Sequence, residues 1–276
     1  MATAATYLFV PGNRPERFQK ALDSGADVVV LDLEDAVAPE AKADARLAIA
    51  AWCARETPSV LRMALRINDH STPWFADDLN VLRQSAIATV LLPKAEAPAD
   101  VERVTAALPM GCRVIPIIES ARGAMHVDAI AATPGVQRLA FGTLDYALDL
   151  DLSGDERGLV TTANRIAIAS KCAGILSPIA GVSAALDDDA QLQADLEFAR
   201  ACGFGAKLCI HPKQVAMVNQ FLTPTEAEID WARRVVTAAK GSAGAFQLDG
   251  RMVDRPVLRK AEAILARAGS AGGQQA

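Results

Sequence analysis

Short runs of β-branched and other apolar residues alternate along the chain with longer stretches in which apolar residues recur at helix spacing. Glycine or proline closes many of the helical stretches, as is usual at helix ends. Eight strands separated by helices favour a closed parallel (β/α)8 TIM barrel over an open doubly wound sheet. The expected strands cover residues 7–11, 28–34, 61–68, 89–94, 113–119, 138–142, 179–183 and 206–211.

Helical periodicity is clear in several of the connecting segments, among them residues 15–24, 39–55, 97–108 and 189–202. After the eighth strand, the pattern predicts a helix over 225–239, a polar joint containing glycine over 247–254, and a last helix from about Pro256 to Arg267. Residues 269–276 are typical of a frayed tail. We therefore expect a barrel domain over residues 1–222 and a C-terminal helical lid and tail over 223–276.

Length and composition agree with a single large core, because 276 residues of 51% apolar composition can fill one barrel. The net charge of −5 argues against a nucleic-acid partner, which normally requires a basic face. The five cysteines show no C-x-x-C spacing, and neither a signal segment nor an 18-residue apolar run is present. We expect a cytoplasmic protein without a membrane partner.

Polar residues follow the apolar runs at the points where the strands should end. Glu34 and Asp35 follow the second run, Glu119 the fifth and Asp145 the sixth. Because the C-terminal ends of barrel strands meet at one mouth, these carboxylates should lie near one another. Oxygen ligands of this kind suit a hard divalent cation, although any one acid alone is more readily explained as a helix N-cap. The pattern therefore predicts a hard-metal site at the mouth.

Several motifs together resemble the citrate lyase β-subunit-like family of acyl-CoA lyases, within the HpcH/HpaI aldolase/citrate lyase group, in order over nearly the whole chain. The resemblance implies a Mg2+-dependent barrel with a C-terminal helical lid, assembled as homotrimers or hexamers. It also implies that a carbon–carbon bond next to a carbonyl is cleaved or formed in a CoA thioester. The matching segments are residues 8–18, 31–37, Lys42, Arg46, 65–68, 92–94, 118–123, 141–145, 210–215 and 250–254.

The resemblance implies roles for five residues of the mouth. Glu119 and Asp145 match the direct Mg2+ ligands, and Glu34 and Asp35 would hold the metal-bound waters. For these two acids the alternative is a buried carboxylate satisfied by an arginine or by backbone N–H groups. Arg66 matches the carboxylate-binding arginine, whose planar fork suits an acid group. A structural salt bridge to Glu34 is an equal alternative for Arg66.

Asp254 belongs to the motif G-x-M-[IV]-D, whose aspartate reaches the neighbouring subunit's site and acts as the acid/base in malyl-CoA lyase-like members. The alternative is an N-cap for the following helix, which Pro256 supports. A group of basic residues near the first two strands is expected to receive CoA phosphates, unless these residues form ordinary solvated helix faces. This basic group consists of Arg14, Arg17, Lys20, Lys42 and Arg46.

Two departures from the resembling family lie near the seventh strand. Many relatives carry Ile-Asp-Gly-Val where this chain has alanine at position 180, and A-R-A-G where it has Cys172 in place of the arginine. Losing an acid and an arginine together suggests a changed pair in that wall. The change is either compensated packing or a different acyl pocket.

The resemblance, with which the residues of the mouth agree, implies a Mg2+-dependent carbon–carbon lyase acting on a short 3-hydroxyacyl-CoA thioester, such as malyl-CoA or citramalyl-CoA, with a small keto acid as product. The developing enolate charge needs a cation and fixed donors. Three alternatives remain: an acyl-CoA thioesterase or malate-synthase-like enzyme, a citrate lyase β subunit acting on an acyl-carrier protein, and a non-catalytic binding module. Glu119, Asp145 and Arg66 argue against the last of these.

Overall fold

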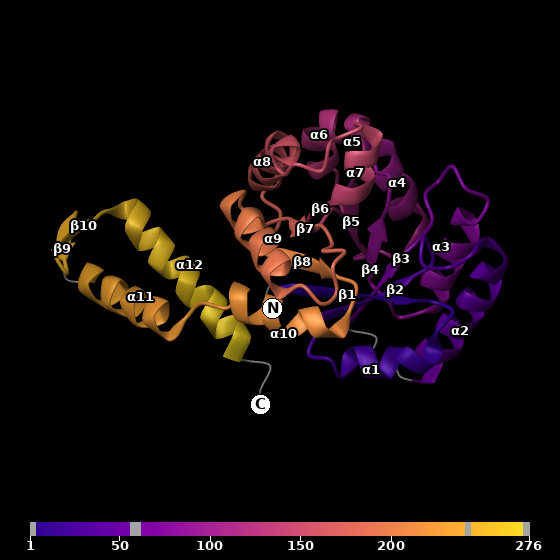
Figure 1. Ribbon diagram of the computed structural model, residues 1–276, viewed down its shortest axis with the longest axis horizontal. Helices are drawn as coiled ribbons and strands as arrows, with labels where there is room; N and C mark the ends of the chain where they lie inside the picture. Colours follow the sequence, from indigo (N-terminus) through magenta and orange to yellow (C-terminus); the bar gives the residue numbers. More distant parts are fainter. Residues whose placement is uncertain (1–3, 56–61, 241–243, 273–276) are drawn as a thin grey trace. The chain divides into compact units, whose positions relative to one another are not determined.

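The computed structural model describes residues 4–55, 62–240 and 244–272, and its elements are labelled in Figure 1. The chain divides into two compact units. Residues 5–218 form the first unit, and the described residues from Asn219 onward belong to the second. Each unit is described by itself.

Eight parallel strands of the first unit close into a barrel in sequential order, with β1 paired to both β2 and β8. This confirms the predicted (β/α)8 architecture. The strands are generally shorter than predicted at their C-terminal ends, so residues such as Glu34 and Asn68 lie in loops above the sheet. Position 61, the predicted start of the third strand, lies outside the described residues. The strands are β1 (Thr6–Pro11), β2 (Val28–Asp32), β3 (Met63–Arg66), β4 (Thr89–Leu92), β5 (Arg113–Ile118), β6 (Ala140–Phe141), β7 (Ile179–Ala180) and β8 (Ala206–Cys209).

Apolar side chains fill both faces of the strands, as expected where a parallel sheet is covered by helices. In β2, for example, Val29, Val30 and Leu31 are fully buried although they point alternately to opposite faces. This explains why the strands read in the sequence as continuous apolar runs rather than as alternating patterns.

Helices surround the barrel strands on the outside (Figure 1). The predicted segments 15–24 and 39–55 each begin with a short 3-10 turn, Pro15–Arg17 and Pro39–Ala41, because proline fixes the backbone at a helix start. The helices are α1 (Phe18–Leu22), α2 (Lys42–Arg55), α3 (Phe75–Gln84), α4 (Pro98–Ala107), α5 (Ala121–Met125), α6 (Val127–Ala131), α7 (Thr143–Asp149), α8 (Arg157–Cys172), α9 (Asp189–Ala201) and α10 (Pro212–Leu222).

The C-terminal unit contains α11 (Glu226–Ala239) and α12 (Arg255–Gly272), joined by a hairpin of β9 (Phe246–Leu248) and β10 (Arg251–Val253). The two helices and the hairpin share a small apolar core. The predicted joint is thus ordered, and α12 continues into the segment expected to fray. Residues 273–276 lie outside the described residues. The core consists of Ala232, Val235, Val253, Ala261 and Ile264.

The hairpin turn follows from two residues that can adopt positive φ. Leu248 pairs with Arg251, so Asp249 and Gly250 form a two-residue turn, with φ values of 52° and 75°. Asp-Gly is the sequence preferred for a type I′ turn, whose twist matches that of the flanking strands. None of the described helices combines the length and the apolar character that a membrane span requires.

Candidate active site

A cavity of about 360 Å3 lies at the mouth of the barrel, where the C-terminal ends of the strands meet. It brings together four of the predicted site residues, Asp35, Arg66, Glu119 and Asp145. Glu34 joins the group through a 2.9 Å ion pair with Arg66. The mouth therefore gathers the predicted carboxylates around one guanidinium.

Arg66 is held mainly by Asp32, at the end of the neighbouring strand β2. Its Nε and Nη2 donate to the two Asp32 carboxylate oxygens at 2.7 and 2.6 Å. Asp32 and Arg66 are register partners, and the Phe9 ring lies 4.7 Å from the guanidinium. The Nε and Nη2 edge of the guanidinium is thus occupied by Asp32, and substrate binding by Arg66 stays a prediction. The Nη1 edge faces Glu34 and Asp35 instead.

Glu34 is buried in the loop after β2, and burial raises its pKa to about 7 despite the nearby Arg66 charge. Its Oε1 lies 3.4 Å from the Lys94 ammonium. Its Oε2 is buried and, although close to Arg66 Nη1, receives no hydrogen bond of normal geometry from the described residues. One acidic oxygen of the mouth therefore lacks a hydrogen-bond partner.

Glu119 follows β5 and is also buried, which raises its pKa to about 8, with the Glu34 charge adding to the shift. The backbone N–H of Lys94 donates to Oε1 at 2.7 Å. The other oxygen, Oε2, faces Gly142, where an added Cβ would overlap it. Only glycine therefore leaves room for this carboxylate. Asp145, in the first turn of α7, is exposed and close enough for its charge to raise the Glu119 pKa.

Lys94 positions two of these acids, a role that the sequence did not reveal. It follows β4 with a φ of 50°, in the left-handed region that a lysine adopts at a cost in free energy. This conformation accompanies the backbone hydrogen bond to Glu119 and the ammonium contact with Glu34. Its place directly after an apolar run was the available signal, but no pattern in the chain indicates a positive φ.

The donor set fits a hard divalent cation. Two buried carboxylates with raised pKa values and one exposed carboxylate face each other across the mouth, with one oxygen left without a hydrogen bond. The described residues contain no cluster of three or more His, Cys, Asp or Glu side chains arranged to bind a metal. A site for Mg2+ does not need one, because this ion binds through one or two carboxylates and retains several waters.

Lys42 has a structural position rather than the predicted phosphate-binding one. It is 4% exposed, and its ammonium donates to the Leu33 and Glu34 carbonyl oxygens at 2.7 and 3.0 Å. The third bond is to Asn68 Oδ1 at 2.8 Å. All three protons are thus used to hold the loop that carries Glu34.

The remaining basic residues divide by their exposure. Arg46 is largely buried and pairs with Asp77 and Asp78 at 3.3 and 3.1 Å, so it too is committed within the fold. Arg14 and Lys20 are exposed, and Arg14 pairs with a neighbouring glutamate at 2.7 Å. Of the basic group, only the residues before and within α1 are open to a ligand, Arg14, Arg17 and Lys20.

Asp254 lies in the C-terminal unit and caps α12. Its Oδ1 accepts a hydrogen bond from the Val257 backbone N–H at 3.2 Å, and the side chain is exposed. The N-cap that was one of the two interpretations of Asp254 is therefore present. This bond uses only one carboxylate oxygen, so it does not conflict with a catalytic role for Asp254, which stays a prediction.

The two departures from the resembling family lie on different elements and differ in exposure. Ala180 is the register partner of Lys207 on β8, whereas Cys172 is exposed at the end of α8. The residue next to Ala180 on β8 is thus the buried Lys207, which the sequence analysis did not identify.

Comparisons with known proteins agree with this geometry. A family model described as HpcH/HpaI aldolase/citrate lyase matches residues 5–212, and one for a carbon–carbon bond lyase of the TIM-barrel fold matches 161–272. A citrate lyase subunit beta-like protein of Mycobacterium tuberculosis is 38% identical over 98% of this chain and 97% of its own length. The chain belongs to the HpcH/HpaI aldolase/citrate lyase family.

The names of two further similar proteins state their substrates or ligands. An L-malyl-CoA/beta-methylmalyl-CoA lyase of Cereibacter sphaeroides is 34% identical over 95% of this chain and 93% of the relative. The crystal structure of CitE from M. tuberculosis, in complex with magnesium, acetoacetate and coenzyme A, has a TM-score of 0.84 and 37% identity, covering 97% of this chain and 99% of that one. The expected enzyme class, a carbon–carbon lyase, is confirmed.

The two raised carboxyl pKa values predict the pH dependence of stability in the presence of EDTA. Above pH 4.5 the folded protein holds protons that the unfolded chain has released, on Glu34 up to about pH 7 and on Glu119 up to about pH 8. The free energy of unfolding should therefore fall as pH rises from about 5 to 8, by up to about 1.4 kcal/mol per pH unit for each group. Urea denaturation at several pH values measures this slope.

Glu119→Gln is the matched variant for this experiment, because it removes one titrating group without changing the size of the side chain. Its stability should depend less steeply on pH than that of the wild type. Equal slopes in the two proteins would contradict the raised pKa of Glu119.

The contacts of Lys42 predict that Lys42→Met destabilises the protein by about 1–3 kcal/mol, because three buried acceptors lose their donor. Lys20→Met, at an exposed position, should change stability by less than about 0.5 kcal/mol. Urea denaturation of both variants tests the assignment. Unchanged stability of Lys42→Met together with weakened CoA binding would instead support the phosphate-binding role.

Proposed function

We propose that this family member is a Mg2+-dependent lyase that cleaves or forms a carbon–carbon bond in a short 3-hydroxyacyl-CoA thioester of the malyl-CoA or citramalyl-CoA type. The observation that carries the proposal is the pair of mouth carboxylates, Glu119 and Asp145, with Gly142 leaving space beside Glu119 Oε2. The magnesium and coenzyme A bound to M. tuberculosis CitE, and the substrate named for the C. sphaeroides relative, support it.

In this proposal Glu119 and Asp145 hold the cation, and Glu34 and Asp35 orient its waters. The bound Mg2+ supplies positive charge for the oxyanion that develops during cleavage. Arg66 donates from its Nη1 edge to the acid end of the substrate. Burial by itself would lower the pKa of Arg66, but the paired Asp32 raises it, so the guanidinium stays charged.

Cleavage also needs a general acid/base that does not face the cation, whose charge would keep a mouth carboxylate ionised. We assign this role to Asp254, with residues 223–276 as the lid that carries it. The residue follows the β9–β10 hairpin and is exposed, with one oxygen in the N-cap bond. In a homotrimer or hexamer the lid of one subunit would supply Asp254 to the site of its neighbour.

The CoA phosphates are assigned to Arg14, Arg17 and Lys20, which are exposed in and before α1. Lys42 and Arg46 are left out of this group because their donors are used inside the fold. Lys42 contributes by holding the Glu34 backbone in place.

The decisive experiment incubates the purified protein with Mg2+ and a panel of 3-hydroxyacyl-CoA thioesters, and identifies the products by mass spectrometry. A lyase releases an oxo acid and a shorter acyl-CoA, whereas a thioesterase releases free CoA and the intact hydroxy acid. In a parallel incubation with an acyl-CoA and an oxo acid, formation of the free hydroxy acid and CoA would indicate a synthase. Activity only on acyl-carrier protein thioesters would indicate a citrate lyase β subunit, and no turnover with any ester would contradict an enzymatic role.

The metal assignment predicts that Glu119→Gln and Asp145→Asn each abolish measurable Mg2+ binding in calorimetry, because each removes one of two ligand charges. The barrel should remain folded, since Asp145 is exposed and Glu119 stands at the mouth. Asp44→Asn, an equal change of charge at an exposed position of α2, serves as the control and should bind normally. Unchanged Mg2+ affinity in both mouth variants would show that the metal is bound elsewhere.

The assignment of Asp254 predicts that Asp254→Asn lowers turnover by about 10² to 10⁴ while Mg2+ affinity stays intact, the usual effect of losing a general acid/base. Asparagine can still cap α12, so stability should change little. Mixing this inactive variant with inactive Glu119→Gln should restore partial activity if Asp254 serves a neighbouring subunit. Failure to complement, with subunit exchange verified by mass spectrometry, would place Asp254 outside the neighbour's site.

A further inference from the structure

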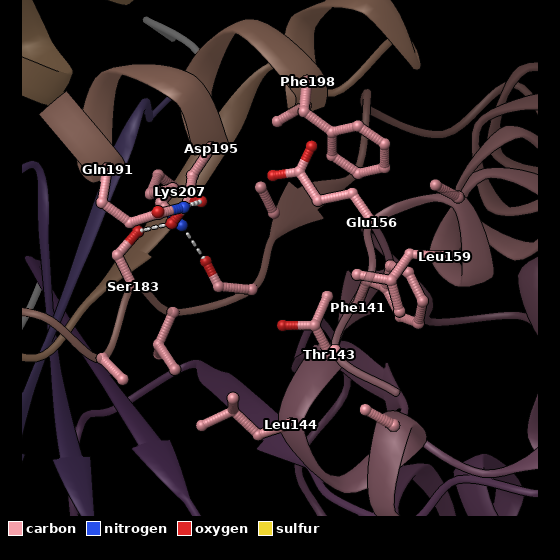
Figure 2. A pocket seen from close by; sticks show the side chains of 18 of the residues that line it. Phe141, Thr143, Leu144, Glu156, Leu159, Ser183, Gln191, Asp195, Phe198 and Lys207 are labelled. Carbon is pink, nitrogen blue, oxygen red and sulfur yellow. Dashed lines mark hydrogen bonds between the residues drawn. The ribbon is translucent and has the colours of Figure 1, made fainter. Parts of the chain in front are cut away.

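A second cavity, of about 400 Å3, lies between strands β6–β8 and helices α8 and α9 (Figure 2). Its wall is mostly apolar, with aromatic rings from the end of β6 and from α9. Three residues, Thr143, Leu144 and Val182, line both this cavity and the mouth. The two cavities are therefore adjacent. Among the residues of the apolar wall are Phe141, Leu159, Ala163, Phe198 and Phe204.

Lys207 brings a buried amine to this cavity. The side chain lines it from β8, and the residue is only 3% exposed. Its Nζ donates one hydrogen bond, to the Gly181 carbonyl oxygen. The described residues provide no second acceptor and no carboxylate within 4 Å of the Nζ. Two of its three N–H groups are thus available to a ligand.

The acids around Lys207 are engaged elsewhere or solvated. Asp195 accepts hydrogen bonds from Ser183 Oγ and, at 2.7 Å, from Gln191 Nε2, and these residues gather on the Lys207 side of the cavity (Figure 2). Glu156, which also lines the cavity, is exposed, so water screens its charge. The register partner of Lys207 on β7 is Ala180, whose methyl group neither pairs with the ammonium nor fills the space.

A buried ammonium is costly when no carboxylate pairs with it directly, even though Asp195 lies close enough for its charge to favour the protonated form of Lys207. Burial lowers the pKa of Lys207 for this reason, and an anion bound beside it would favour the charged form. An inorganic anion would satisfy the charge but leave the apolar wall in contact with water. The combination of amine and apolar wall selects a ligand with both an acidic end and a hydrocarbon part.

We propose that the cavity beside β7 and β8 is a binding site for a short-chain organic carboxylate, with the carboxylate on Lys207 and the chain against Phe141 and Phe198. The volume is within the range of about 300–1,000 Å3 usual for small-molecule sites. The site adjoins the metal mouth, but binding there does not depend on the proposed lyase activity. Its occupant would contact Thr143 and Leu144, directly before the proposed ligand Asp145.

Hexanoate is the probe that tests this site by calorimetry, with hexanol as the neutral molecule of the same chain length and acetate as the anion without a chain. We expect hexanoate to bind more tightly than either. Lys207→Met should weaken hexanoate binding at least about tenfold, the effect of losing one charged hydrogen bond. Lys213→Met, an exposed lysine outside the cavity lining, is the control and should bind as the wild type does.

Ala180→Asp provides an independent variant, because it places a carboxylate opposite Lys207 in the sheet register. This internal partner should displace hexanoate and weaken its binding by a similar factor, so the test stands even if Lys207→Met does not fold. The proposal is overturned if the wild type does not bind hexanoate, if hexanol binds equally well, or if Ala180→Asp binds hexanoate as tightly as the wild type.

Discussion

The bidentate ion pair between Arg66 and Asp32 is the interaction on which the barrel mouth depends. Both residues end neighbouring strands and are partners in the sheet register, so the strand pairing itself places the guanidinium. Once its fork is bound to Asp32, Arg66 has only its Nη1 edge left for Glu34 and for a ligand. Burial, together with the charges of the neighbouring acids, raises the pKa values of Glu34 and Glu119, and the single Arg66 guanidinium does not offset this shift.

The surrounding structure holds these unsatisfied acids in place rather than neutralising them. The Lys42 ammonium donates to the Glu34 carbonyl oxygen, and the Lys94 backbone N–H donates to one carboxylate oxygen of Glu119. Gly142 keeps the space beside the other oxygen free. Such a site is unfavourable when empty of positive charge and becomes favourable when a divalent cation enters. This electrostatic argument supports the metal-dependent chemistry proposed here for a member of the HpcH/HpaI aldolase/citrate lyase family.

The sequence predicted the barrel and its acidic mouth because both follow from local patterns, apolar runs and the polar residues that end them. It could not separate Lys42 from the exposed Lys20, because the burial of Lys42 depends on how α2 packs over the β2 loop. Asp32 could be recognised as the partner of Arg66 only once the strand register was known. The positive φ of Lys94 could not be predicted, because no sequence pattern indicates it. The β9–β10 hairpin was predictable from its Asp-Gly turn, but the surrounding polar residues favoured a loop. Lys207 became notable only when the register placed it opposite an alanine.

The most direct test of this account is a crystal structure of the protein grown with Mn2+ in place of Mg2+, with the metal located by anomalous scattering. The account predicts one strong peak at the barrel mouth, bonded to one oxygen each of Glu119 and Asp145, with waters held by Glu34 and Asp35 completing the coordination. A fully occupied metal bound elsewhere, or a mouth in which Glu119 remains protonated and without metal at saturating Mn2+, would contradict it.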